Sequence, residues 1–484
     1  MRGGIHPLAN TWRELLVLVL VCAAAAACGT KPDTSAHGTA AERPVHASAR
    51  DRDWIFVSID TLRADHLPFY GYERETAGEA DDPFSLAWLA EQGTVYDSVW
   101  APIGKTMPSL ASFWTGEFPL EHGAVSNPTV LTVPTWAESF QAHGYRTHAA
   151  VANRAISRGC GLEKGFESYQ MLPKELEPSL PGALLDRARP HIDAGEPLML
   201  WAHFMAPHQP YTPPEELARR FSERPLTPAD NDALYAYHAQ PETLDEATRQ
   251  AIIGLYDGEI LAAAGWVQEL LTGLDAAYRG AGRGGLLDEA TVVFFSDHGE
   301  ELAERHGYFL HAKSLYRGVL QVPLVVAGRG AAVGRQSQPR SLLDVLPELL
   351  ALEAPAREVW AASWQTEYYA LRDARWTLIH NPTQDGGAGP FEPPRGVPYP
   401  YQSIELYDRS QDLYEMVNVA ERHPAEVERM LGRMQAWYQA TPQGEVTHIP
   451  GGDMRQRLYE LGYLEFAHQV IAPWTVEQWK QAQE

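Results

Sequence analysis

Short apolar runs alternate with amphipathic segments along most of the chain from residue 53 onward. Five of the runs have a length and composition typical of buried strands: 54–59, 147–152, 198–204, 292–296 and 322–326. Apolar residues recur at helical spacing in 85–93 and 135–143, and a glycine closes each segment. This alternation predicts an α/β fold with a doubly wound, mostly parallel sheet.

Two polar stretches interrupt this pattern. Residues 213–250 are rich in proline and charge and predict an insertion at the surface, and the glycine-rich residues 280–285 predict a loop. The 484 residues of the chain are enough for one large domain and a smaller one.

The pattern changes after about residue 352. Segments 367–371 and 376–379 predict antiparallel strands around a turn at Asp373, and 424–438 has the apolar spacing of a helix. The glycine- and proline-rich residues 385–401 predict a loop. We therefore expect a smaller C-terminal α+β subdomain, with domain limits at 51–355 and 356–484.

The N-terminal segment has the features of an export signal. Arg2 and Arg13 precede an apolar run at 15–27, which is short for a membrane span but suits a signal peptide. Small residues before Cys28 resemble a bacterial lipoprotein cleavage site, where the cysteine is lipidated. We expect residues 1–28 to form this leader, residues 29–50 to form a flexible tether, and Cys28 to anchor an exported lipoprotein in the membrane. An ordinary cleaved signal peptide is the alternative.

Charge and cysteine content exclude several kinds of function. The formal net charge is -24, from 39 basic and 63 acidic residues, so the chain is a poor candidate for binding nucleic acid. The three cysteines are Cys22, Cys28 and Cys160. Loss of Cys22 with the leader and lipidation of Cys28 would leave Cys160 without a partner. The sequence therefore predicts neither a disulfide framework nor a cysteine-rich metal site.

Acidic and imidazole side chains follow two of the predicted strands directly. Asp60 comes after strand 54–59, and Asp297 and His298 come after strand 292–296. In an open α/β sheet the carboxyl ends of parallel strands lie side by side, and ligands bind beyond them. Two carboxylates and a histidine brought to this edge predict a site for a divalent metal ion.

A hydroxyl residue begins a predicted helix between these two segments. Pro108 suits the first turn of a helix and Gly116 suits its end, which places Thr106 at or just before the N-terminus. Backbone N–H groups and the helix dipole favour an anion there. A hydroxyl at this position can also contact a metal ion and become a nucleophile. Alone, Thr106 is an ordinary N-cap residue.

The chain resembles the sulfatase branch of the alkaline phosphatase superfamily over residues 53–420. The matching motifs occur in the order found in that family: Asp60-Thr61-Leu62-Arg63-Ala64-Asp65-His66, Thr106-Met107-Pro108-Ser109 leading to Thr115-Gly116, Glu121-His122-Gly123, Gly144-Tyr145-Arg146-Thr147 with Gly165-Phe166, Pro207-His208-Gln209-Pro210, Ser296-Asp297-His298-Gly299-Glu300, His311-Ala312-Lys313-Ser314-Leu315-Tyr316, and Glu405-Leu406-Tyr407-Asp408 followed by Asn418. The resemblance implies an alkaline-phosphatase-like sheet and an enzyme that acts on esters.

The resemblance also implies residue roles. Asp60, Asp297 and His298 would bind the metal ion, and Thr106 takes the position of the nucleophile and completes the coordination sphere. The residues that hold the anionic oxygens of the ester and assist the leaving group match His208 and Lys313. His122 and His311 are placed at the site as well, either in catalysis or as support.

Three departures from the family pattern affect the expected chemistry. Sulfatases convert a Cys or Ser in a C/S-x-P-x-R motif to formylglycine, whereas this chain has Thr106 there and Leu110 in place of the arginine. A lysine usual in the family is replaced near Asn153. A threonine nucleophile resembles phosphodiesterases, phosphonate hydrolases and phosphoethanolamine transferases of the superfamily.

We therefore expect a metal-dependent hydrolase or transferase of phosphoric or sulfuric esters that uses Thr106. Its substrate would be a small-molecule, lipid or glycan ester. A sulfatase that works without formylglycine is the first alternative, and an inactive binding lipoprotein on the same fold is the second. Two carboxylates, an imidazole and a hydroxyl suit one Mn²⁺ or Zn²⁺ ion, while Ca²⁺ or Mg²⁺ would prefer an all-oxygen shell.

Overall fold

A computed structural model describes residues 49–127, 129–222, 234, 237, 240–305, 309–311, 314–350, 358–362, 368–381, 402–448 and 472–482. The predicted leader with Cys28, the tether up to residue 48, Lys313 and the predicted loop 385–401 lie outside these residues. Residues 39–484 form one compact unit, and the description below concerns that unit alone.

An eight-stranded sheet forms the centre of this unit. Its strand order is β10-β2-β9-β7-β1-β6-β4-β5. The strands are β1 (Asp53–Ile59), β2 (Gly93–Tyr96), β4 (Arg146–Val151), β5 (Ser168–Met171), β6 (Leu198–Phe204), β7 (Ala290–Ser296), β9 (Leu324–Gly328) and β10 (Gly334–Gln336). Strands β7, β1, β6, β4 and β5 are all parallel, and β9 runs antiparallel to β7 and β2. The predicted mostly parallel α/β fold is thus confirmed.

The predicted strand 322–326 divides in two. Residues Gln321–Val322 form β8 in a small second sheet with β3 (Val99–Trp100) and β11 (Arg340–Ser341), and β9 begins at Leu324. Pro323 lies between them. Because proline has no N–H to give to a strand ladder, it favours a change of sheet at this position.

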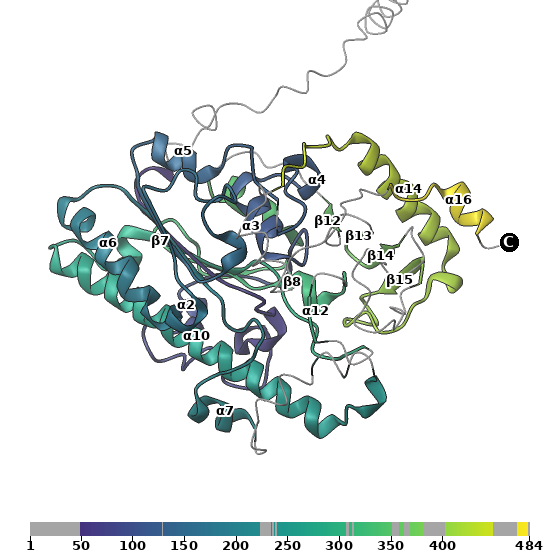
Figure 1. Ribbon diagram of the computed structural model, residues 1–484, viewed down its shortest axis with the longest axis horizontal. Helices are drawn as coiled ribbons and strands as arrows, with labels where there is room; N and C mark the ends of the chain where they lie inside the picture. The colour runs from purple at the N-terminus through teal and green to yellow at the C-terminus, as the bar shows by residue number, and fades with distance from the viewer. Residues whose placement is uncertain are drawn as a thin grey trace, which may run out of the picture. The chain divides into compact units, whose positions relative to one another are not determined.

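Helices cover both faces of the central sheet (Figure 1). Helices α3 (Thr106–Thr115) and α5 (Trp136–Ala142) lie on one face, and α2 (Leu86–Glu91), α6 (Leu180–Ala194) and α10 (Glu246–Gly280) lie on the other. Successive side chains of β1 point to opposite faces of the sheet. Trp54 and Phe56 pack in the core under α3 and α5, and Ile55 and Val57 pack in the core under α2, α6 and α10. The sheet is therefore buried on both faces, as parallel sheets generally are.

Much of the predicted surface insertion 213–250 that the structure describes is helical. Helix α7 (Glu215–Phe221) packs against α10, and residues 246–250 form the first turn of α10 itself. The Asp245 side chain caps this helix by accepting a hydrogen bond from the Thr248 N–H at 2.6 Å. Polar residues of that turn face solvent, which gave the segment the composition of a loop.

A second, antiparallel sheet lies in the C-terminal part of the unit. It consists of β12 (Val359–Ala362), β13 (Tyr369–Arg372), β14 (Trp376–His380) and β15 (Ile404–Asp408), with α14 (Pro424–Ala440) and α16 (Val476–Gln481) nearby. The predicted turn at Asp373 joins β13 to β14, and its carboxylate accepts hydrogen bonds from the N–H groups of Arg375 and Trp376. This small sheet confirms the α+β pattern predicted for the C-terminal region.

The unit also shows how the two sheets join. A β-bridge links Ile103, which precedes α3, to Ala362 of β12. The side chains of Phe118 and Leu120 pack in the same core as Trp360.

Within the described part of the chain, no helix combines the length and the hydrophobicity that a membrane crossing requires.

Candidate active site

The carboxyl ends of β1 and β7 bring two aspartates together. These strands are neighbours in parallel register, with Ile59 opposite Ser296, so Asp60 and Asp297 leave the sheet at the same point. Both side chains and that of His298 are fully buried. One ligand atom from each of the three lies within 4.8 Å of the others. The structure thus assembles the group of residues that the strand ends predict.

The polar atoms of this group face one another without the usual partners. Among the described residues, Asp60 Oδ1 and both carboxylate oxygens of Asp297 accept no hydrogen bond. His298 Nδ1 donates to the Gly299 carbonyl at 3.0 Å, which leaves Nε2 with its lone pair 3.4 Å from Asp297 Oδ2 and 3.7 Å from Asp60 Oδ1. Buried carboxylates without partners are costly, so a divalent cation fits this donor set.

The pKa values of the two aspartates are shifted by burial and by the charges close to them. Burial and the adjacent charge of Asp60 raise the pKa of Asp297 well above its usual range. Burial alone would also raise the pKa of Asp60, but the contact with His203 and the charges of His208 and His298 outweigh it and lower that pKa. Two carboxylates this close therefore do not both ionise easily unless a cation joins them.

Thr106 is the first residue of α3 and faces the same centre. Its Oγ1 lies 3.4 Å from Asp60 Oδ2 and 3.5 Å from His298 Nε2. The next N–H of the helix, from Met107, donates to Asn127 Oδ1 at 3.2 Å. The hydroxyl therefore stands between the positive end of a buried helix and the predicted metal ligands.

Two further side chains belong to the group but were not assigned to it from the sequence. Asn153 follows β4, and its Nδ2 donates to Asp60 Oδ2 at 2.5 Å and to Thr106 Oγ1 at 3.3 Å. His203, on β6, brings Nε2 to 3.5 Å from Asp60 Oδ2, while its Nδ1 lies 2.8 Å from Ser58 Oγ. Both sit at the ends of parallel strands, β6 beside β1 and β4 beside β6, and the same strand-end rule that selected Asp60 could have found them.

Two predicted histidines extend the site outward from His298. The rings of His298 and His311 lie 4.5 Å apart between centroids, and those of His311 and His208 lie 5.0 Å apart. His311 Nδ1 is 2.8 Å from Glu300 Oε1, and His208 Nδ1 donates to the Gln209 carbonyl at 2.6 Å. Burial lowers the pKa of His208 to about 4, so its imidazole is neutral near pH 7.

Two side chains from another element hold the backbone of the segment that carries His208. Lys174 Nζ donates to the His208 carbonyl at 2.7 Å, and Glu177 accepts the Ala206 N–H at 3.1 Å. Both of these residues lie on a 3-10 helix at Lys174–Ser179, directly before α6. His208 is thus held by its own loop and by a second element.

His122 is the remaining predicted residue, and two further residues, Leu110 and Lys105, lie in or next to α3. The ring nitrogens of His122 have other contacts: Nδ1 accepts the Ala124 N–H at 3.1 Å, and Nε2 lies 3.0 Å from Ser112 Oγ of α3. Leu110 is buried in the apolar core. Lys105, directly before α3, is buried, and its charge adds to burial in lowering the pKa values of His298 and His311.

A family comparison agrees with this arrangement. The model of the sulfatase family, described as "Sulfatase", matches residues 52–353. The chain belongs to the sulfatase family. The resemblance inferred from the motifs is thus confirmed, within the alkaline phosphatase superfamily.

Individual relatives are more distant. A choline-sulfatase from Rhizobium meliloti (strain 1021) is 42% identical over 67 residues, which is 14% of this chain and 13% of that protein. An arylsulfatase K from Xenopus laevis is 24% identical over 320 residues, or 55% of this chain and 58% of that protein. The chain therefore spans about an eighth and somewhat over half of the lengths of these curated relatives.

Solved structures show the same fold at low identity. A phosphonate monoester hydrolase from Silicibacter pomeroyi superimposes with a TM-score of 0.59 at 18% identity, covering 81% of this chain and 96% of that one. A sulfatase-fold protein solved with its substrate D-glucosamine-2-N,6-O-disulfate gives a TM-score of 0.59 at 18% identity, covering 81% and 99%. These sulfatase-family folds match the sheets described above.

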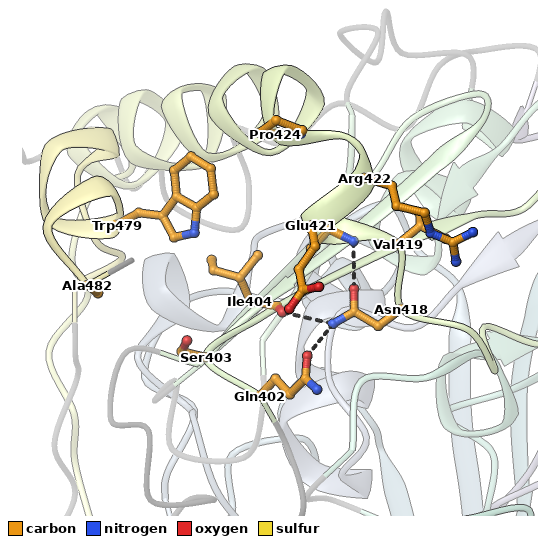
Figure 2. A pocket seen from close by; sticks show the side chains of 11 residues that line it. Gln402, Ser403, Ile404, Asn418, Val419, Glu421, Arg422, Pro424, Trp479 and Ala482 are labelled. Carbon is orange, nitrogen blue, oxygen red and sulfur yellow. Dashed lines mark hydrogen bonds between the residues drawn. The ribbon is translucent and has the colours of Figure 1, made fainter. Parts of the chain in front are cut away.

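The C-terminal sulfatase motif has a structural role in this chain. A cavity of about 860 Å³ lies beside β15, α14 and α16, and Figure 2 shows the side chains that line it. There Asn418 Oδ1 accepts the N–H groups of Leu406 and Ala420, and its Nδ2 donates to the Ile404 carbonyl at 3.1 Å. Asn418 therefore holds the segment after β15 against that strand.

Proposed function

We propose that this protein is a metal-dependent hydrolase or transferase of phosphoric or sulfuric esters, with Thr106 as nucleophile and with phosphorus esters preferred. The observation that carries the proposal is the position of Thr106 Oγ1, 3.4 Å from Asp60 Oδ2 and 3.5 Å from His298 Nε2, at the N-terminus of a buried helix. The same residues provide a nucleophile, donors for a cation and a helix end that favours anions.

The donor set supports a single divalent ion at the nucleophile. Asp60, Asp297 and His298 would hold it, together with Thr106 Oγ1, and mixed oxygen and nitrogen ligands favour Mn²⁺ or Zn²⁺. When bound, such an ion lowers the pKa of a coordinated hydroxyl and polarises an ester oxygen. Sulfatase-family enzymes typically depend on a metal ion, which agrees with this assignment.

In the proposed reaction Thr106 Oγ1 forms a bond to phosphorus as the bond from phosphorus to the leaving oxygen breaks. Thr106 gives up one proton to solvent, and the departing alkoxide takes one up. The amide of Asn153 donates toward the position of the attacking oxygen. Water then hydrolyses the threonine ester in a hydrolase, whereas a second alcohol takes the group in a transferase.

The leaving group needs a proton donor, and His208 and Lys313 are the proposed sources. Since the Nδ1–H of His208 is bonded to the Gln209 carbonyl, a donated proton has to come from Nε2. The neighbouring negative charge of a bound ester would favour the protonated form of that ring. Lys313 lies outside the described residues and keeps its role from the family resemblance.

Thr106 is the reason to prefer phosphorus. A formylglycine hydrate expels sulfate by elimination, and a threonine ester has no equivalent route. Leu110 also lies in the apolar core, so its position adds no positive charge to the site. Sulfate esters are the second candidate because both curated relatives are named as sulfatases. A glycan ester is one substrate class to test, given the sulfated glucosamine bound by a structural neighbour.

Paired aryl substrates test this proposal. The purified protein, loaded with Mn²⁺ or Zn²⁺, is assayed on bis(nitrophenyl) phosphate, nitrophenyl phenylphosphonate, nitrophenyl phosphate and nitrophenyl sulfate. Turnover of a phosphorus ester is expected, with a loss of about a thousandfold or more in Thr106→Ala. Thr115→Ala is the matched control, since Thr115 ends the same helix and its hydroxyl donates to the Ala111 carbonyl.

The outcomes separate the alternatives. Turnover of the sulfate alone would overturn the preference for phosphorus, and equal turnover by Thr106→Ala would remove the nucleophile. No turnover of any ester by protein with stoichiometric metal would favour an inactive binding protein.

A further inference from the structure

A second group of metal-ligating side chains lies at the opposite edge of the central sheet. His148 is the third residue of β4, Glu167 directly precedes β5, and His191 lies in the last turn of α6. One ligand atom from each of these three residues lies within 4.8 Å of the others. The active-site group lies beyond the carboxyl ends of the strands, whereas His148 lies near the start of β4. The two groups are therefore separate.

His148 provides the observation that distinguishes this group from an ordinary polar surface. The residue is 5% exposed, and among the described residues its Nε2 has no hydrogen-bond partner. Its Nδ1 lies 2.8 Å from Ser168 Oγ, on the paired residue of β5. The backbone alternation of β4 directs this ring to the face covered by α6, where His191 lies.

The two imidazoles are arranged as a pair of ligands. Their rings are stacked, with centroids 5.0 Å apart and an angle of 18° between planes. His191 Nδ1 lies 2.6 Å from Glu196 Oε2, so a carboxylate orients this ring and, as the proton donor is Nδ1, Nε2 carries the lone pair that a metal ion can use. A histidine ligand whose other nitrogen is held by a carboxylate or hydroxyl is the usual arrangement around metal ions in proteins.

Charges around the group are compatible with a cation. Arg146 bridges Glu167 and Glu196, at 3.3 and 2.9 Å, and the carboxylate of Glu167 retains lone pairs for a second contact. Burial first, and then His191, Arg187 and Arg146, lower the pKa of His148 to about 4, against the opposing charge of Glu167. His148 is therefore neutral near pH 7, which is the form that binds metals.

We propose that His148, Glu167 and His191 form a second metal site, which binds Zn²⁺ or a similar first-row divalent ion. Two imidazoles and one carboxylate are a ligand set that zinc accepts, with a fourth position left for water. The side chains of Glu167 and His191 are 31% and 21% exposed, so an ion and its water can enter from solvent. A bound ion would tie β4, β5 and α6 together and stabilise this edge of the sheet.

Zinc binding tests the proposal without reference to ester turnover. Equilibrium dialysis against Zn²⁺, with metal analysis of the protein, is carried out on an Asp60→Asn/Asp297→Asn double variant of the full chain, which lacks both carboxylates of the active-site group. One tightly bound Zn²⁺ per chain is expected. Adding His191→Ala should lower zinc affinity at least about tenfold, and adding His143→Ala, a partly exposed histidine that ends α5, should not.

A second variant and a second measurement guard against misfolding. Glu167→Gln keeps the shape of its side chain and should also weaken zinc binding at least about tenfold. Added Zn²⁺ should raise the melting temperature of the double variant but not that of the variants that carry His191→Ala or Glu167→Gln. A double variant that binds no zinc, or His191→Ala protein that binds zinc as well as His143→Ala protein, would overturn the proposal.

Discussion

Two groups of similar side chains lie at opposite ends of the strands of the central sheet, and they differ in burial and in hydrogen bonding. We call the side where the parallel strands end the carboxyl edge and the side where they begin the amino edge. At the carboxyl edge, Asp60, Asp297 and His298 are fully buried, and several of their polar atoms have no partner among the described residues. At the amino edge, Glu167 and His191 are partly exposed, and nearby side chains orient both imidazoles and pair with the carboxylate. Burying unpaired charge costs stability, which is why the carboxyl edge is the one at which we propose the chemistry.

The two ends of β1 show the same contrast within one strand. Asp53, at its start, is buried, but its carboxylate accepts hydrogen bonds from the Leu198 N–H at 2.8 Å and from the Tyr278 hydroxyl at 2.7 Å. Asp60, just past its end, has one oxygen without a hydrogen-bond partner among the described residues. Both oxygens of Asp53 are bonded within the fold, whereas one oxygen of Asp60 is available to a ligand.

The largest expected effect separates these two aspartate environments. Asp297→Asn should lower metal affinity and turnover at least about a hundredfold, because it removes one of two carboxylate ligands. The same change should raise the stability of the metal-free protein by about 1–3 kcal/mol, because it relieves the repulsion with Asp60. Melting curves in the presence of a chelator, with metal-binding titrations, measure both effects.

Asp53→Asn is the matched control for that experiment. It should leave metal binding unchanged and lower stability, since it weakens the bonds to Leu198 and Tyr278. A metal-free Asp297→Asn protein that is less stable than wild type would contradict the view that the carboxyl edge is strained by like charges.

A smaller effect is expected from Ser58, which contacts His203 rather than a predicted metal ligand. Ser58 Oγ lies 2.8 Å from His203 Nδ1 and accepts the Trp201 Nε1–H at 2.9 Å, so it orients the ring that faces Asp60. Ser58→Ala should lower metal affinity at the active site about tenfold, in the range found for other groups that orient ligands. Metal titration of this variant should show weaker binding at the active site and unchanged zinc binding at His148. Wild-type affinity at the active site would show that Ser58 does not position this group.

The smallest effect concerns His122, whose ring nitrogens contact Ser112 and Ala124. Burial lowers the pKa of His122 to about 3, below the ordinary value of 6.5, so between these values the unfolded chain binds the extra proton. Stability from this residue is therefore present above pH 6.5 and is lost as the pH falls, at about 1.4 kcal/mol per pH unit.

His122→Asn tests this by removing the titrating group. The variant should be about 1–2 kcal/mol less stable than wild type at pH 7, because it loses the bonds to Ser112 and Ala124. That difference should fall by about 1.6 kcal/mol between pH 6.5 and 5, which brings the two proteins to about equal stability, as followed by chemical denaturation. A difference that stays constant with pH would show that His122 is not held neutral in the folded protein.

Local patterns in the sequence were enough to determine the strands that end at Asp60 and Asp297, the helix that begins at Thr106, and the Asp373 turn. Strand alternation, helical spacing and the preferences of proline and glycine act over a few residues, so they can be read without tertiary contacts. The chemistry of the strand-end residues, together with the ordered family motifs, then led to the metal-ligand group.

Tertiary structure alone decided which residues joined that group and which did not. Asn153 and His203 reach Asp60 because β6 pairs with β1 and β4 pairs with β6, and strand order depends on pairings between distant segments. The meeting of His148 with His191 requires α6 to pack across β4, and the contacts of His122 with Ser112 and Ala124 depend on the packing of its segment against α3. Such contacts arise from packing between residues far apart in the sequence, and local periodicity carries no information about them.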